Sequence, residues 1–386
     1  MSCFHFAAFV ILFSSVFTVF GETQNTQESD TTLISFPFNS PRSNGMGGNH
    51  AAFVDDFETI FVNPAGFTTA EDQFSVAAFD ITVHDIDTTL RLISSNFSDP
   101  SVYAARIKNR YESGFNSNGP LMIGSLKGDG GWAFLNRQYL KIWWERDNIF
   151  VVNANMVEEI AFYFGRSFPL KNFEETITLT PGFTIKPNYR IVFAPREILA
   201  VDFRHILRNL QEQPLEFQMG IGVNTGLLLS FFDMVYFSVV LNDLPSPLYV
   251  TRYTSYTDYA DGIAPSATNW AFLKPSYDFS ACFRSKNVFP GEIVRDIVLA
   301  IDYHLSSDAL ENADRNVFLN IGAGLELQLL RAFWIRAGWQ QMLPGAGFGV
   351  DFGWVKLDAA VFGETFGDQL SDFQGASFSL GLSFRF

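Results

Sequence analysis

The last twelve residues, GASFSLGLSFRF (375–386), decide the fold class. Phe378, Leu380, Leu382, Phe384 and Phe386 alternate with small or polar residues, so in a strand they share one face. In a soluble sandwich that face points to a core, whereas in an outer-membrane barrel it points to lipid and the small polar face lines the lumen. In a barrel, Phe384 and Phe386 would also form the terminal signal that is read by the barrel-assembly machinery.

The same alternation recurs along the sequence from residue 73 onward. One such segment runs from Val317 to Leu327, and a turn at 330–332 leads to the next, from Phe333 to Trp339. A transmembrane strand needs about 9–11 residues, and about fourteen segments of suitable length can be marked between 73 and 386. The sequence therefore predicts an all-β fold, a transmembrane antiparallel barrel of about 14 strands. An even number places both termini on one side of the membrane, which is the periplasmic side in bacterial barrels.

The composition agrees with a barrel in contact with outer-membrane lipid. The 386 residues are 16% aromatic and 17% charged, with a formal net charge of −15. A typical soluble domain has about 25% charged residues. Beyond the first 21 residues no apolar run approaches the roughly 20 residues that a spanning helix needs. Any crossing of the membrane is therefore expected to use strands.

Residues 1–21 form an apolar run without Asp, Glu, Lys or Arg, and the polar stretch ETQNTQESD follows. This layout predicts a secretory signal peptide, although a single amino-terminal membrane anchor is an alternative. Cys3 lies too early in the run to be a lipid-attachment site. Removal of the signal leaves Cys282 alone, so neither an intrachain disulfide nor a cysteine-based metal site is expected.

Residues typical of catalysis or metal binding are scattered. The five histidines form no HExxH motif, and neither CxxC nor GxxxxGK[ST] occurs. His50 lies near Asp55 and Asp56, but no nucleophile spacing accompanies them, so a hydrolase is a remote alternative. We expect no catalytic residues, no metal, no cofactor and no nucleic-acid partner.

The segment 22–72 differs from the rest because it lacks strand alternation. It contains eight acids and one base, Arg42, for a net charge of −7. Gly45, Gly47 and Gly48 permit unusual backbone angles, and Pro64 biases the preceding residue away from helical geometry. A barrel of about fourteen strands is wider than side chains alone can fill. We therefore predict that this segment bends back into the lumen as a plug.

The stretch MGGNHAAFVDDFETIFVNPAGF (46–67) resembles the amino-terminal hatch of FadL-type outer-membrane long-chain fatty-acid transporters, and in particular their shorter spirochaete-type branch. The resemblance implies passive uptake of a long-chain fatty acid or another hydrophobic small molecule past this hatch. It rests on the glycine pair after Met46, the aspartate pair and the Asn-Pro-Ala-Gly turn. The candidate gate residues are Gly45, Met46, Gly47, Gly48, Asp55, Asp56, Asn63, Pro64, Ala65 and Gly66.

A loop helix is expected near 195–210, where Pro195 can open the first turn. Leu199, Phe203, Ile206 and Leu210 would share one face. This face either packs on the barrel rim or forms an apolar platform for a hydrophobic ligand. The resemblance favours ligand binding, because its third outer loop commonly carries such helices.

An alternative function is a non-transporting barrel that binds a protein partner at the cell surface or in secretion. The loop YVTRYTSYTDYADGI (249–263) is rich in tyrosine, which is enriched at interfaces. The strongly acidic plug would also repel a fatty carboxylate. An apolar pocket reaching the plug would favour transport, and a sealed lumen would favour the partner.

Overall fold

The computed structural model describes residues 38–48, 50–87, 89–90, 112–145, 148–171, 176–193, 198–199, 209–244, 246–286, 294–306 and 314–386. All of them belong to one unit, Leu33–Phe386. The expected signal peptide, 1–21, and the first part of the expected plug lie outside the described residues. Among the described residues, no helix is long and apolar enough to cross a membrane.

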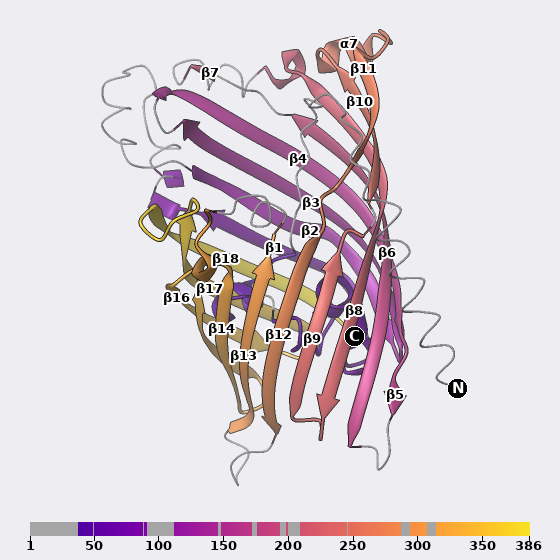
Figure 1. Cartoon of the computed structure of the whole chain (residues 1–386), viewed down its shortest axis with the longest axis vertical. Coiled ribbons are helices and arrows are strands. Elements are labelled where there is room, and N and C mark those ends of the chain that lie inside the picture. Colours follow the sequence, from indigo (N-terminus) through magenta and orange to yellow (C-terminus); the bar gives the residue numbers. More distant parts are fainter. Residues whose placement is uncertain are drawn as a thin grey trace. The chain divides into compact units, whose positions relative to one another are not determined.

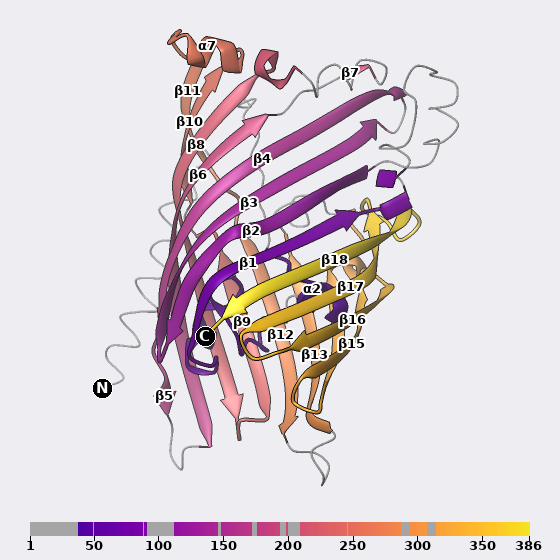
Figure 2. The same ribbon diagram turned by 180° about the vertical axis from the view of Figure 1, so that it is seen from behind.

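The described strands form one antiparallel sheet (Figures 1 and 2). They are β1 Gln73–His84, β2 Glu112–Lys127, β3 Gly130–Glu145, β4 Asn148–Ser167, β5 Leu170–Lys171, β6 Ile177–Phe193, β7 Ile198–Leu199, β8 Leu215–Phe231, β9 Val235–Asn242, β10 Pro247–Tyr253, β11 Ala267–Phe272, β12 Ser276–Lys286, β13 Val294–Leu305, β14 Ile321–Leu329, β15 Phe333–Gln340, β16 Leu343–Asp351, β17 Val355–Phe366 and β18 Phe373–Arg385.

The sheet closes on itself, because β1 pairs with β2 on one side and with β18 on the other. β8 pairs with β10 along 215–220 and with β9 along 225–231, so β9 and β10 are successive parts of one barrel strand. β11 and β12 are likewise successive parts of the next. With the two-residue strands β5 and β7 set aside, the barrel has fourteen strands, which confirms the predicted fold class.

The two faces of the terminal strand differ as the alternation predicts. Ser377 and Ser379 are fully buried, whereas Leu380 is 44% exposed. The same outward exposure of apolar side chains recurs around the barrel, for example at Phe79, Phe162, Ile185, Met219, Phe237, Ile301, Phe348 and Val361. An apolar outer face and a polar inner face fit a barrel in an outer membrane.

Three local expectations are wrong. The tyrosine-rich stretch is not a loop throughout, because Pro247–Tyr253 continues as β10 and Tyr256–Ala260 forms the helix α7. Residues Val317–Asn320 form the 3₁₀-helix η4 before β14 begins. Ile198–Leu199 pairs with β4 as β7, where a helix was expected, because pairing to a neighbouring strand overrides a local helical period.

Candidate functional site

The described residues between 38 and 72, here called the luminal segment, lie inside the barrel. They form the helices α2 (Pro41–Met46) and α3 (Thr59–Val62) and the 3₁₀-helix η1 (Pro64–Thr68). α2 contacts β14 to β18, whereas η1 contacts β3, β4, β6 and β8. These two groups of strands lie on different sides of the ring, and Figure 2 shows α2 beside β15 to β18. The luminal segment therefore crosses the lumen between them.

Local capping explains why α2 forms in so few residues. Ser40 and Ser43 make a capping box, in which the Ser40 Oγ accepts from the Ser43 N–H at 3.1 Å and the Ser43 Oγ accepts from the Ser40 N–H at 2.9 Å. Pro41 occupies the first turn. At the other end Gly47 has a φ of 76°, and the Gly48 N–H donates to the Ser43 carbonyl at 3.0 Å.

The Asn-Pro-Ala-Gly turn is also built locally. Asn63 is extended, as the following proline requires, and its Oδ1 accepts from the Ala65 N–H at 2.9 Å. Its Nδ2 donates to the Ala51 carbonyl at 2.7 Å, which ties the two halves of the luminal segment together. Gly66 does not have a positive φ. It is needed for space, because a Cβ there would lie 2.2 Å from the Val54 Cγ2.

Where α2 contacts the barrel wall, glycines allow the two backbones to pack directly against each other. A Cβ added to Gly47 would lie 2.5 Å from the Trp339 nitrogen, and one added to Gly338 of β15 would lie 2.2 Å from the Met46 carbonyl carbon. The small residues that alternate along the strands are therefore the docking surface for the luminal segment as well as the inner face of the barrel.

Arg42 is the centre of an ionic face of the luminal segment. Its Nη1 donates to the Asp55 Oδ1 and to the Asp56 Oδ2, both at 2.8 Å. Its Nε and Nη2 donate to the two oxygens of Glu326 on β14 at 3.1 and 2.8 Å. One buried guanidinium therefore joins both parts of the segment to the wall through charge-assisted hydrogen bonds.

Cations of the wall compensate the acids of the luminal segment. The Arg284 Nη1 lies 3.2 Å from the Asp55 Oδ2, and the Lys356 Nζ lies 3.5 Å from the Asp56 Oδ2. Arg336 completes the network by donating to Glu326 at 2.6 Å and to Asp358 at 2.5 Å. Asp55 and Asp56 of the luminal segment are thus paired with cations in the fold.

The pKa values of two neighbouring acids of the luminal segment, Asp56 and Glu58, are shifted in opposite directions. Burial would raise the pKa of Asp56, but the charges of Arg42 and Lys356 hold it below its usual range. For Glu58, burial and the negative charge of Asp56 raise the pKa to about 7. The Glu58 carboxyl is therefore half protonated near neutral pH, whereas Asp56 stays charged.

His50 is a second polar anchor of the segment. Its ring pairs with Asp302 of β13, and its Nε2 lies 2.8 Å from the Met46 carbonyl oxygen. Burial alone would lower the pKa of His50, but the Asp302 carboxylate outweighs burial and raises it. His50 is thus part of the attachment of the segment to the wall.

The other face of the luminal segment is apolar. Phe38 stacks on Phe61 at 4.4 Å between ring centroids, and Phe61 meets Tyr163 of β4 edge-on at 4.9 Å. The buried cluster continues on the wall through Met122, Leu126, Ala133 and Leu135 of β2 and β3.

Two cavities lie at opposite ends of β17. The larger one, about 540 Å³, is lined by Asn39, by His84 and by residues 364–368 at the end of β17. The smaller one, about 280 Å³, is lined by Arg42 and Asp55 and by Lys356 at the start of β17. The luminal segment contributes to both linings and lies between them.

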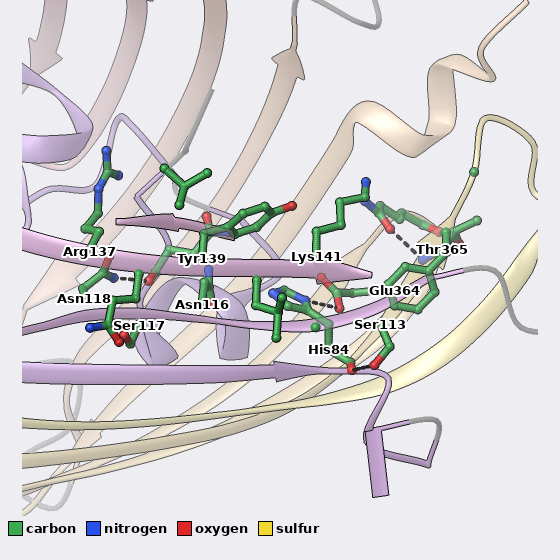
Figure 3. A pocket seen from close by; sticks show the side chains of 18 of the residues that line it. His84, Ser113, Asn116, Ser117, Asn118, Arg137, Tyr139, Lys141, Glu364 and Thr365 are labelled. Carbon is green, nitrogen blue, oxygen red and sulfur yellow. Dashed lines mark hydrogen bonds and ion pairs between the residues drawn. The ribbon is translucent and has the colours of Figure 1, made fainter. Parts of the chain in front are cut away.

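The larger cavity combines polar and apolar groups (Figure 3). The His84 Nδ1 lies 2.7 Å from the Glu364 Oε2, and Arg137, which lines the cavity, pairs with the buried Glu159. Further polar groups come from β2 and β3, and apolar surface comes from Tyr139, Leu140, Val157 and Phe366. A cavity of this kind suits a molecule that has both polar and apolar parts.

The ligand residues that were expected from the sequence are not brought together among the described residues. Leu199 ends β7, and Leu210 begins the 3₁₀-helix η3, Leu210–Glu212. Phe203 and Ile206 lie outside the described residues. The sequence analysis missed Arg137, Glu326 and Arg336. Each could have been found in the sequence as a charged residue at a strand position that faces the lumen.

No family model and no curated protein matches the sequence. Among solved structures, the chain is similar to the toluene transporter TodX of P. putida, with a TM-score of 0.48 and 11% identity over 91% of this chain and 99% of that one. It is also similar to the Ralstonia pickettii toluene transporter TbuX, with a TM-score of 0.47 and 10% identity over 90% and 98% of the two chains. A Pseudomonas aeruginosa FadL homologue gives a TM-score of 0.44 and 12% identity over 92% and 98%.

Proposed function

We propose that this protein is an outer-membrane channel for passive uptake of a long-chain fatty acid or another hydrophobic molecule, and that the luminal segment is its gate. The observation that carries the proposal is the position of the segment between two cavities at opposite ends of β17. A ligand that enters one cavity reaches the other only when the segment moves. The gate residues in this proposal are Gly45, Met46, Gly47, Gly48, Asp55, Asp56, Asn63, Pro64, Ala65 and Gly66.

The lining supports an amphipathic ligand. A volume of about 540 Å³ is within the range of about 300–1,000 Å³ that is common for ligand pockets. The apolar part of this lining, from Tyr139, Leu140, Val157 and Phe366, offers surface for an alkyl chain, which gains about 0.8 kcal/mol per buried CH₂. Wall cations pair with Asp55 and Asp56, which reduces the negative field that a ligand carboxylate would meet there.

We further propose that the smaller cavity and both termini face the periplasm and that residues 1–21 direct export. The end of β18, the start of β1 and the smaller cavity lie at the same end of the barrel, since the Phe74 N–H donates to the Phe386 carbonyl and Arg385 lines that cavity. The larger cavity then faces the cell exterior.

The proposal is tested with purified protein in planar bilayers and in proteoliposomes. A chain that lacks residues 22–72 should conduct ions far more strongly than the full chain. The full chain should admit a fluorescent long-chain fatty acid faster than empty liposomes do. Equal, near-zero conductance of both chains would show that another part closes the lumen, and absence of fatty-acid entry would remove the proposed ligand class.

A non-transporting barrel that binds a protein partner is the second candidate. The observation that favours it is α7, where Tyr256 and Tyr259 are 46% and 44% exposed above the β10–β11 pair. Ser255 caps α7, and Tyr259 packs on Phe217 at 4.6 Å, so the tyrosines are held in place. A photo-crosslinker at position 256 in intact cells tests this candidate. A single discrete protein adduct would favour it, and lipid adducts alone would not.

A further inference from the structure

A small polar cavity lies where the apolar and ionic faces of the luminal segment meet. It measures about 50 Å³ and lies between the segment and strands β1, β2, β17 and β18. Glu58 enters it from the segment, and the Ser40 Oγ donates to the Glu58 Oε2 at 2.9 Å. Ser40 is also the cap of α2, so the carboxyl of Glu58 touches the start of the helix that docks on the wall.

The cations near Glu58 are already engaged by other carboxylates. Lys356 lies 3.4 Å from Asp358 as well as near Asp56, and Arg42 binds three carboxylates. Arg385 pairs with Asp351. Each of these cations therefore already pairs with another carboxylate, and among the described residues that line the cavity an ionised Glu58 has no cation of its own. The charged and titratable groups that face it are Arg42 and Asp56 from the segment, Asp80 from β1, Lys356 and Asp358 from β17, and Arg385 from β18.

We propose that Glu58 is a proton-controlled latch of the luminal segment. When it is protonated, it adds no charge to this cavity and the segment stays docked. When it is ionised, it is repelled by the charged Asp56, and this repulsion outweighs the hydrogen bond from Ser40, so that the docked state is weakened. This inference rests on the proposed gating role of the segment and adds its regulation.

The direction of the pH response follows from proton linkage. The docked state raises the pKa of Glu58 to about 7, above the ordinary glutamate value, so docking binds a proton that undocking releases. Undocking is therefore favoured as the pH rises from about 4.5 to about 7 and is unaffected by this group at higher pH. His50 is also titratable, and Asp302 raises its pKa, but it attaches the segment to β13 and not to this cavity.

Cys282 provides a native reporter of docking. It is buried on β12 in one cluster with Met46, Ala52 and Phe53 of the segment. Of the two cysteines in the sequence, the other is Cys3 within the expected signal peptide. A thiol reagent should therefore reach Cys282 only when the segment leaves this part of the wall.

The experiment measures Cys282 labelling by a methanethiosulfonate reagent and bilayer conductance at pH 5 and pH 8. The full chain, Glu58→Gln and the exposed control Glu71→Gln are compared. Because thiols react faster at high pH in any protein, each labelling rate is divided by that of Glu58→Gln at the same pH. We expect this ratio to rise on the order of tenfold between pH 5 and pH 8 for the full chain and for Glu71→Gln. Bilayer conductance of the full chain and of Glu71→Gln should likewise rise more between pH 5 and pH 8 than that of Glu58→Gln.

A ratio that stays flat between pH 5 and pH 8 means that Glu58→Gln responds to pH as the full chain does. This result overturns the latch and assigns any shared pH response to His50. The chain without residues 22–72 separates this failure from failure of the gate. If that chain conducts strongly at both pH values while the full chain ignores pH, only the latch is wrong. If it conducts no better than the full chain, both proposals fail.

Discussion

The luminal segment meets the barrel wall through two unlike interfaces. Toward β2, β3 and β4 it packs phenylalanine rings against apolar side chains, and toward β12, β14 and β17 it is held by a network of ion pairs. Apolar packing is non-directional and tolerates small shifts, whereas paired charges need one geometry and respond to pH. We therefore expect the ionic side to control the proposed release of the segment while the apolar side still holds it.

The largest effect is expected from a deletion that prevents closure of the barrel and so removes both interfaces at once. Phe384 pairs with Ala77 of β1, and the Phe386 N–H donates to the Phe74 carbonyl at 2.8 Å, so these residues close the barrel. Deleting residues 384–386 should abolish assembly in the outer membrane while export continues. Heat-modifiable gel mobility and surface protease access measure this. Normal assembly of the shortened chain would contradict the role of the terminal strand.

The next effect breaks the ionic interface alone. Arg42→Met leaves Asp55, Asp56 and Glu326 around a buried position without its cation, and removing one partner of a buried ion pair costs about 3–5 kcal/mol. We expect an assembled barrel with raised conductance and accessible Cys282. Arg42→Lys is the matched control. Its conductance should lie between those of the full chain and Arg42→Met, because lysine keeps the positive charge but lacks the paired N–H donors of the guanidinium. Unchanged conductance in Arg42→Met would show that the apolar face suffices.

A smaller effect is expected where the two halves of the luminal segment touch. A Cβ at Gly66 would lie 2.2 Å from the Val54 Cγ2, so Gly66→Val should overpack the turn at a cost of about 1–3 kcal/mol. The barrel should still assemble, because its strands supply their own backbone hydrogen bonds. Entry of a labelled long-chain fatty acid into proteoliposomes should fall. If entry is unchanged, the turn has no part in passage.

The smallest effect probes the apolar interface. Phe61→Leu keeps a buried hydrophobe but loses the contacts with Phe38 and Tyr163, at a cost below about 1.5 kcal/mol. We expect a modest rise in Cys282 labelling that is the same at pH 5 and pH 8. A rise that depended on pH would mean that the two interfaces do not act separately.

Much of the architecture could be predicted because strand alternation is a local property. The face shared by Phe378 and Leu380 follows from a period of two, and the turn at 330–332 follows from the end of one alternating run. The expected helix at 195–210 failed at β7 because Val151 and Val152 of β4 pair with it, and such pairing cannot be read from the local period.

The sequence by itself predicted a barrel of about fourteen strands, a bent acidic segment before it, and a non-helical Asn63 before Pro64. These features depend on neighbouring residues, whose spacing fixes which faces and caps can form. Only the tertiary structure decided which charges meet. Arg42 and Glu326 are 284 residues apart, and Glu58 meets Asp80, Lys356 and Asp358 only because the closed sheet brings β1 and β17 around one cavity. Electrostatic energies depend on distance and burial in space, so the ion pairs of Arg42 and the surroundings of Glu58 exist only in the folded chain.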